Sequence, residues 1–315
     1  MSLPRGVVAA GVTPFRADGS IHVPLFAEHT ASLLRSGCDA VLLFGTTGEG
    51  LSLTAEERRV ALEQVVDHGL PPGRLLVGTG SLAFPDLVEL TRAATARGVG
   101  GVLVPPPFHI KAVSDAGVYR TYDELVQRVG DADLRLYAYH FPQLTGVEVS
   151  FTVLEELRRA YPGQVAGVKD SSGEWDHTET LCHQFPDLDV YAGTERLLRP
   201  ILDAGGAGCI SATVNLTAPL AAAVRSGWQA GDDVAALQDD LATLRAHIAS
   251  FPMIPALKTL LAHRSGRDDW LHTRPPLPSL PDPSLDSLAP IDRLLDETLA
   301  AHDLRTPARE PDAPE

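Results

Sequence analysis

The sequence predicts a (β/α)8 barrel, an α/β fold of the TIM-barrel type, followed by a C-terminal helical appendage. Short apolar runs alternate with amphipathic helical patterns eight times over about 225 residues, close to the usual length of such a barrel. The apolar runs lack polar alternation, which is typical of parallel strands buried on both faces. The competing topology is an open doubly wound sheet, which usually has fewer strands. Eight units without a break in composition favour the barrel.

The predicted strands are rich in Val, Leu, Ile and Ala, and each is followed by a helical pattern. The strands cover Gly6–Pro14, Ala40–Gly45, Arg74–Gly80, Gly101–Pro106, Leu134–Pro142, Val165–Asp170, Leu188–Gly193 and Ala207–Ala212. The helices cover Pro24–Leu34, Ala55–Asp67, Pro85–Arg97, Ala116–Val129, Thr152–Ala160, Asp176–Gln184, Arg196–Ala204 and Thr217–Arg225.

Residues at the boundaries support these elements. Pro24 and Pro85 occupy first-turn positions, where a missing N–H costs nothing. Thr54 and Glu57 form a capping-box pattern at the start of the second helix. Glycines stand where C-terminal caps are expected, at Gly98, Gly163 and Gly205.

After residue 226 the strand patterns stop, and three helices are predicted over Asp232–Ala249, Pro255–Ala262 and Ile291–His302. A Pro-rich stretch, Arg274–Pro290, precedes the last of them. We therefore expect a barrel catalytic domain over residues 1–226 and a C-terminal helical domain over 227–304. Residues 305–315 are rich in Pro and charge and are predicted to be a disordered tail.

Composition excludes several classes of protein. The 315 residues carry 26 basic and 41 acidic side chains, a net charge of −15, which opposes binding to nucleic acid or to an anionic membrane surface. No apolar run approaches the roughly 18 residues of a membrane helix, and Met1–Phe15 lacks the long apolar stretch of a signal peptide. The cysteines, Cys38, Cys182 and Cys209, are scattered and odd in number. This pattern favours a reducing cytoplasm.

Active sites of such barrels lie at the C-terminal ends of the strands. Lys169, one of three lysines, ends the sixth strand. A partly desolvated strand end disfavours the ammonium form, and a neutral amine can form a Schiff base with a carbonyl. The alternative is a structural lysine paired with a carboxylate. The other two, Lys111 in a loop and Lys258 on a late helix, are predicted to be solvated.

Two further strand ends carry candidate chemistry. Gly45-Thr46-Thr47-Gly48 offers hydroxyls and free backbone N–H groups that suit a carboxylate or phosphate, although a tight turn explains it equally well. Tyr139, near the end of the fifth strand, has a phenol that can relay a proton, whereas a buried structural tyrosine is the alternative.

Four motifs together resemble the dihydrodipicolinate synthase/N-acetylneuraminate lyase family. They are Gly45-Thr-Thr-Gly-Glu49, Tyr139-x-x-Pro142-x-x-Thr145-Gly146, Gly167-Val-Lys169-Asp-Ser-Ser-Gly173 and Gly206-Ala-Gly-Cys-Ile210-Ser-Ala-Thr. They follow the family's order, and the likeness covers about residues 5 to 300. It implies a barrel with a C-terminal helical domain, a homo-oligomer (tetramer or dimer), and a Schiff-base aldolase or lyase acting on pyruvate-type 2-oxo acids.

The resemblance assigns roles by matching position. Lys169 would form the imine, so no cofactor or metal is expected. Tyr139 would donate and accept the proton, with Thr46 passing protons to its hydroxyl. Thr47, with the backbone N–H groups beside Gly45, would hold the pyruvyl carboxylate. The carbonyl of Ile210 would approach the pyruvyl group.

Two departures from the synthase pattern bear on the substrate. Leu144 stands where lysine-pathway synthases carry an arginine, and no tyrosine occurs between Val104 and Val118. The motif around Tyr139 instead resembles the lyase branch. We therefore expect cleavage of a 2-oxo-3-deoxy sugar acid or related hydroxy-oxo acid, with Gly193 and Glu195 contributing to substrate binding and Arg196 as a possible substitute cation.

Other functions are weighed against this one. One alternative is a 4-hydroxy-tetrahydrodipicolinate synthase condensing pyruvate with aspartate semialdehyde, and a second is a non-catalytic sugar-acid sensor on the same barrel. Gly78-Thr-Gly80-Ser-Leu-Ala83 matches a dinucleotide pattern, but the next strand ends without the acidic residue that holds a ribose. The histidines show no HxH or HExxH spacing for a metal, and no GxSxG elbow is present.

Overall fold

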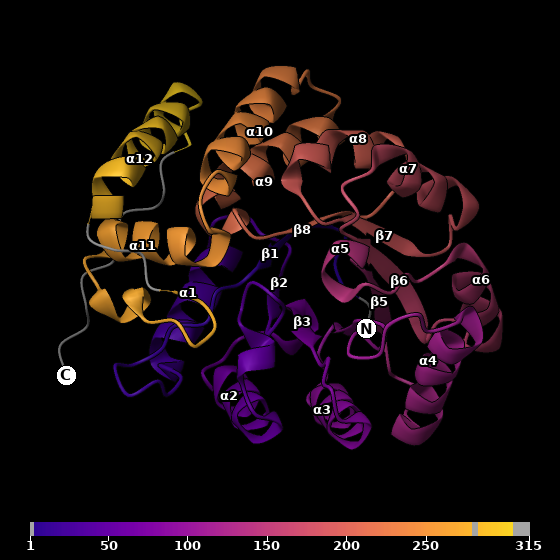
Figure 1. Cartoon of the computed structure of the whole chain (residues 1–315). Helices are drawn as coiled ribbons and strands as arrows, with labels where there is room; N and C mark the ends of the chain where they lie inside the picture. The colour runs from indigo at the N-terminus through magenta and orange to yellow at the C-terminus, as the bar shows by residue number, and fades with distance from the viewer. Residues whose placement is uncertain (1–2, 279–282, 305–315) are drawn as a thin grey trace.

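The computed structural model describes residues 3–278 and 283–304. Its centre is a closed barrel of parallel strands that follow one another around the barrel in sequence order (Figure 1), as predicted. The strands are β1 (Gly6–Ala10), β2 (Ala40–Leu43), β3 (Leu75–Gly78), β4 (Gly101–Val104), β5 (Leu136–His140), β6 (Val165–Asp170), β7 (Asp189–Ala192) and β8 (Gly208–Ser211).

Each strand is followed by a helix on the outside of the barrel (Figure 1). The capping box of Thr54 and Glu57 is present at the start of the second helix. The outer helices are α1 (Val23–Arg35), α2 (Ala55–Asp67), α3 (Phe84–Ala96), α4 (Asp115–Val129), α6 (Phe151–Ala160), α7 (Trp175–Gln184), α8 (Leu198–Asp203) and α9 (Val214–Ala230). Short elements at loops and strand ends are η1 (Gly50–Ser52), η2 (Pro72–Arg74), α5 (Pro142–Thr145) and η3 (Glu195–Leu197).

Several predicted strands were too long at their C-terminal ends. The residues after β1 remain apolar, and Val12 and Phe15 are fully buried although they lie outside the strand. Burial beneath the loops at the barrel mouth, rather than strand pairing, accounts for their apolar character.

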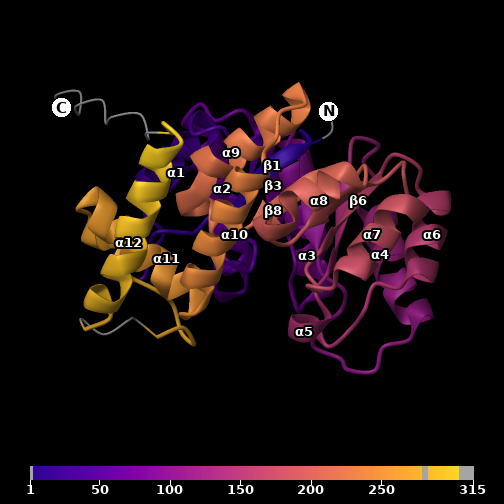
Figure 2. The ribbon, with the colours of Figure 1, turned by 90° about the horizontal axis from the view of Figure 1, so that it is seen from above.

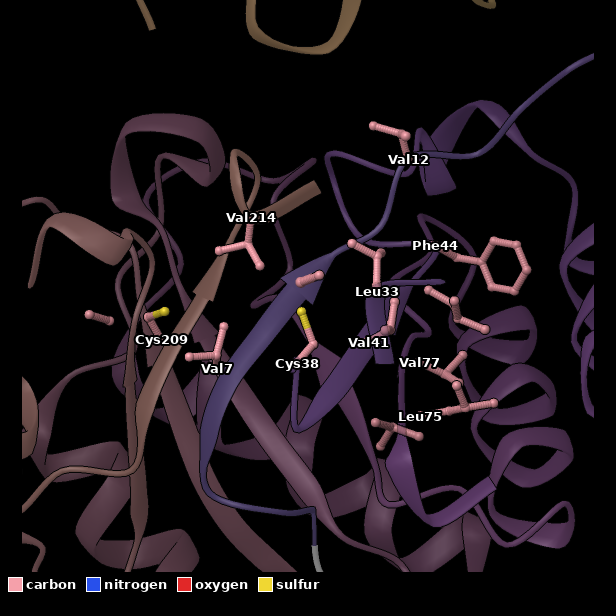
Figure 3. Close-up of a cluster of buried hydrophobic side chains, with 14 of the residues drawn as sticks. Val7, Val12, Leu33, Cys38, Val41, Phe44, Leu75, Val77, Cys209 and Val214 are labelled. Carbon is pink, nitrogen blue, oxygen red and sulfur yellow. The ribbon is translucent and has the colours of Figure 1, made fainter. Parts of the chain in front are cut away.

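Apolar side chains form two separate layers. One fills the barrel interior and includes Val8, Leu42 and Ile210. The other lies between strands and helices and includes Val7, Val41 and Leu75, whose side chains are drawn in Figure 3. The alternation follows from the period of two along each strand. Both faces of the barrel strands are therefore buried, as their uninterrupted apolar sequence indicates.

The C-terminal helices pack beside the barrel rather than around it (Figure 2). They are α10 (Ala235–Ala249), α11 (Met253–Ser265) and α12 (Pro283–Ala301), with η4 (Asp268–Leu271) between the last two. Helix α9 continues past the expected domain boundary at 226 to Ala230. The last helix begins well before the predicted start at Ile291 and runs through Pro290. Buried Leu288, Ile291 and Leu295 hold it against its neighbours despite the missing proline N–H.

The expected tail at residues 305–315 lies outside the described residues. Among the helices in the two described ranges, none combines the length and apolar character needed to cross a membrane.

Candidate active site

Lys169 and Tyr139 lie side by side at the C-terminal ends of two neighbouring strands. They are paired in the register of β5 and β6, and the Lys169 Nζ lies 4.6 Å from the centroid of the Tyr139 ring. Each residue is only 6% exposed. The lysine amine and the tyrosine phenol are therefore both largely shielded from water.

Two further tyrosines close the barrel below this pair. Tyr137 and Tyr191 are fully buried, with ring centroids 6.0 Å apart. Their hydroxyls donate to the Asp189 carboxylate at 3.2 Å and to the Pro4 carbonyl at 3.1 Å. Burial raises the pKa of both phenols, so neither is suited to proton transfer. Tyr139, the third tyrosine of the interior layer, lies nearer the mouth, and its proton-transfer role stays a prediction.

The loop from Gly45 to Gly48 lies at the end of β2. Two residues with left-handed backbone bracket it, Phe44 with φ 56° and Glu49 with φ 55°. The Thr13 hydroxyl donates to the Gly48 carbonyl at 2.7 Å. Thr46 is exposed and Thr47 is half-buried. The hydroxyls thus flank a constrained turn, while the proton relay from Thr46 to Tyr139 stays a prediction.

Lys258 is not solvated, and that prediction was wrong. Its side chain and that of Glu49 are each 1% exposed and form a salt bridge. The lysine lies on α11, whose pattern suggested a surface position, but Phe15 of the barrel covers it, with the ring centroid 4.4 Å from Nζ. The partner is 209 residues distant in sequence, so local pattern carried no signal for it.

Lys111 is exposed as predicted, although its ammonium has partners. It donates to the Thr145 carbonyl at 2.8 Å and to the Phe108 carbonyl at 3.0 Å, which ties the loop after β4 to α5. Leu144, also on α5, is 49% exposed. The side chain that replaces the synthase arginine therefore lies on an accessible surface.

Glu195, expected to contribute to substrate binding, is fully buried. Its carboxylate accepts hydrogen bonds from the hydroxyls of Ser211 and Thr213, and the Arg245 guanidinium lies 3.7 Å away. The carboxylate has no exposed surface, so it is not open to a sugar hydroxyl in this conformation. The geometry instead gives Glu195 the role of fixing the end of β8, just after Ile210, whose side chain belongs to the interior layer.

Gly193 follows β7 and packs against the end of β6. Its N–H donates to the Asp170 carbonyl at 2.6 Å. A Cβ here would lie 2.1 Å from the Ser171 Oγ, so no larger residue fits. Gly193 thereby lets two neighbouring strand ends approach closely. Arg196 is exposed nearby, so it remains available as a cation near the mouth.

A polar cluster that sequence reasoning missed lies directly behind the Lys169–Tyr139 pair. His140, Asp170 and His177 come together between the strands and α7, each offering one ligand atom within 4.8 Å of the others. Asp170 accepts from the His177 Nδ1 at 3.1 Å and from the Thr178 hydroxyl at 2.6 Å. The sequence distance between His140 and His177 hid this cluster from spacing rules.

The hydrogen bonds of this cluster argue against a metal ion. The Val149 N–H donates to the His140 Nδ1 at 3.2 Å, so the neutral ring carries its proton on Nε2. Burial lowers the pKa of His140, which keeps it neutral. The hydrogen bond to Asp170 raises the pKa of His177. The His140 ring therefore has no free lone pair for a metal ion. The cluster instead supports the ends of β5 and β6 through packing and hydrogen bonds.

Comparisons with known proteins agree with the barrel fold. The model of the dihydrodipicolinate synthetase family matches residues 3–291. An uncharacterized DapA-like lyase from Chloroflexus aurantiacus is 37% identical over 284 residues, covering 89% of this chain and 93% of that protein. Dihydrodipicolinate synthase from Agrobacterium tumefaciens is 32% identical with a TM-score of 0.82, covering 94% and 98% of the two chains. A catalytic lysine mutant of Ruminococcus gnavus sialic acid aldolase shares the fold, with a TM-score of 0.86, 19% identity and coverage of 96% and 98%.

Proposed function

Because this chain belongs to the dihydrodipicolinate synthetase family and is a lyase, we propose that it cleaves a 2-oxo-3-deoxy sugar acid or related hydroxy-oxo acid. The products are pyruvate and an aldehyde. The observation that carries the proposal is the shielded pairing of the Lys169 amine with the Tyr139 phenol, 4.6 Å from nitrogen to ring centroid.

In the proposed reaction Lys169 is the nucleophile. Its neutral amine attacks the C2 carbonyl of the 2-oxo acid, and loss of water from the carbinolamine gives an iminium ion. A base removes the proton of the C4 hydroxyl, the C3–C4 bond breaks, and its electron pair enters the iminium as an enamine. Tyr139 is the group placed to move these protons. Protonation at C3 and hydrolysis of the imine release pyruvate, so no metal or cofactor is required.

The Gly45–Gly48 loop binds the carboxylate in this proposal. Thr47 donates its hydroxyl, and backbone N–H groups beside Gly45 supply further donors. Thr46 passes protons to Tyr139, and the Ile210 carbonyl approaches the pyruvyl group.

The choice of a hydroxylated substrate rests on Leu144. This residue is 49% exposed and apolar, so position 144 offers no charge to the second carboxylate of aspartate semialdehyde. A bidentate arginine–carboxylate contact contributes about 1.5–3 kcal/mol, or roughly 10- to 150-fold in affinity. A neutral sugar-acid tail does not need that contact.

We also infer that the enzyme is a homo-oligomer in a reducing cytoplasm. Exposed large apolar side chains lie on successive loops at the mouth of the barrel, which favours association: Leu51, Leu82, Ile110 and Leu144. The three cysteines are free and buried.

Trapping with borohydride tests the imine. We expect pyruvate plus borohydride to add the mass of a reduced pyruvyl adduct at Lys169 and nowhere else. Lys169→Ala should remain folded, take no label and lose turnover. Substantial turnover in pure Lys169→Ala would remove the nucleophile from the proposal. A screen of 2-oxo acids, with pyruvate release coupled to a dehydrogenase, then identifies the substrate.

The second candidate is 4-hydroxy-tetrahydrodipicolinate synthase activity, which the 32% identity to the Agrobacterium tumefaciens enzyme favours. Steady-state assays with pyruvate and aspartate semialdehyde decide between them. A kcat/KM of about 10⁴ M⁻¹s⁻¹ or more would establish the synthase reaction instead. A protein that binds sugar acids without forming the imine would be a sensor.

A further inference from the structure

The salt bridge between Lys258 and Glu49 joins two parts of the chain that the proposed reaction does not otherwise connect. Lys258 belongs to α11 of the C-terminal domain, and Glu49 follows the Gly45–Gly48 loop directly. Both side chains are 1% exposed. Burying two charges costs several kcal/mol per ion before their attraction is counted. Because the pair is costly to bury, its position beside the Gly45–Gly48 loop suggests that it serves that loop.

Both carboxylate oxygens of Glu49 are bound by residues of the C-terminal domain. The Lys258 ammonium also donates to the His272 carbonyl at 2.8 Å. The second carboxylate oxygen of Glu49 accepts from the Arg274 N–H at 2.9 Å. The Glu49 side chain is thus fixed at one oxygen by Lys258 of α11 and at the other by the backbone N–H of Arg274, which follows η4.

This fixed side chain controls an unfavourable backbone conformation. Glu49 has φ 55°, a left-handed geometry that costs a non-glycine residue on the order of 1 kcal/mol and persists only when its surroundings impose it. In that conformation the Glu49 N–H donates to the Thr46 carbonyl at 3.1 Å and closes the turn that holds Thr46 and Thr47. The side-chain anchor and the shape of the turn are therefore coupled through one residue.

We propose that the Lys258–Glu49 pair is a positioning element that holds the Gly45–Gly48 loop in the shape that receives the carboxylate of a 2-oxo acid. The C-terminal helical domain thereby contributes to substrate binding without touching the substrate. This inference rests on the proposed function, because it assigns the loop to carboxylate binding.

Docking of the C-terminal domain does not by itself require this pair. Buried ion pairs are often replaced by apolar residues without loss of stability. A second ion pair, Arg267 with Glu28 at 2.7 Å, already links η4 to α1, with side chains 29% and 54% exposed. It lies away from the loop and provides a matched control that joins the same two parts of the chain.

The test measures the pyruvate concentration that half-saturates borohydride labelling at Lys169. We expect Glu49→Gln and Lys258→Met each to raise this concentration at least tenfold while the labelling at saturation stays complete. The control Arg267→Gln should stay within twofold of the parent protein. Circular dichroism and thermal unfolding confirm that each variant is folded. Unchanged half-saturation in folded Glu49→Gln and Lys258→Met would overturn the inference.

The double variant Glu49→Gln/Lys258→Met separates positioning from the cost of an unpaired buried charge. It removes both charges, so stability should recover relative to the single variants while the half-saturating concentration stays high. If stability and the half-saturating concentration both returned to the parent values, the single variants would have failed only through the unpaired charge. That result would refute a positioning role for the pair. If proteins lacking Lys258 do not fold, Glu49→Gln decides alone, since it keeps the side chain's size. Failure of the parent protein to label would count against the proposed function and not against this inference.

Discussion

Lys169 and Tyr139 occupy paired register positions on adjacent parallel strands, with the lysine nitrogen 4.6 Å from the centre of the tyrosine ring. Residues paired across parallel strands point to the same face of a sheet. Both side chains therefore enter the barrel together, and the rigid strands fix their separation. The two groups to which the proposed function assigns imine formation and proton transfer are thus positioned by secondary structure rather than by flexible loops.

Tyr139→Phe should keep the fold and the ability to form the imine but lose most of the rate. Positioned proton transfer contributes about 10²–10⁴-fold. Stopped-time turnover assays measure kcat, and borohydride labelling reports the imine separately. An unchanged kcat would show that another group transfers the proton.

Thr47→Val should raise KM for the 2-oxo acid, because it removes a hydrogen bond that exists before the chemical step. The isosteric Thr46→Val is the matched comparison and should instead lower kcat. Initial-rate measurements over a range of substrate concentrations separate the two parameters. If Thr47→Val lowers only kcat, the two threonines have exchanged roles.

Leu144→Arg should increase kcat/KM for aspartate semialdehyde with pyruvate by tenfold or more. The position is 49% exposed, so the guanidinium pays little desolvation there. Leu144→Gln, which has a polar side chain without charge, should give much less. Equal gains in both variants would show that polarity, rather than carboxylate recognition, limits the synthase reaction.

The His177–Asp170 pair should make stability depend on pH. Its hydrogen bond to Asp170 raises the pKa of His177 above 6.5. Burial alone would raise the pKa of Asp170, but bonds from His177 and Thr178 hold it below 3.8. The stabilisation is therefore complete between about pH 4 and 6.5 and declines as pH rises through the folded-state pKa of His177. His177→Asn should lower the free energy of unfolding by about 1–3 kcal/mol at pH 6 and by less at pH 9.

Urea unfolding of both proteins at several pH values measures this difference. His140 stacks on His177 with ring centroids 4.5 Å apart, and Glu148 adds a negative charge nearby. The difference in the free energy of unfolding between the parent protein and the variant isolates the His177 contribution from most of the effect of these neighbours. A difference that does not change between pH 6 and pH 9 would contradict a charged His177.

The sequence predicted the barrel and the Lys169–Tyr139 pair because both depend on short-range patterns. Buried strands show as apolar runs, and strand ends of a closed parallel barrel converge on one mouth. Helix starts followed from local capping, as at Thr54. The start of α12 could not be predicted from local sequence, because Pro290 interrupts the helical pattern while long-range packing keeps the helix intact.

The polar contacts behind the site could not be predicted, since each joins residues distant in sequence. Lys258 contacts Glu49, which is 209 residues distant in sequence. Ser211 contacts Glu195, which is 16 residues distant, and the path of the chain between them cannot be read from sequence. An ionisable residue on a helix is usually solvated, and only the fold reveals a buried partner. The positions of the candidate strand-end residues were therefore accessible from sequence, whereas the residues that support them were not.

In the proposed cleavage, the two buried tyrosines beneath the site set the order in which the products leave. With Tyr137 and Tyr191 filling the barrel below Lys169, reactants and products share one entrance. The aldehyde fragment lies nearer that entrance than the covalently held three-carbon fragment, so it must depart first. Kinetics should accordingly be ordered, with pyruvate inhibiting competitively against the sugar acid and the aldehyde inhibiting noncompetitively. Because the other end of the barrel is closed, the two products of the proposed reaction must leave through the same opening in a fixed order.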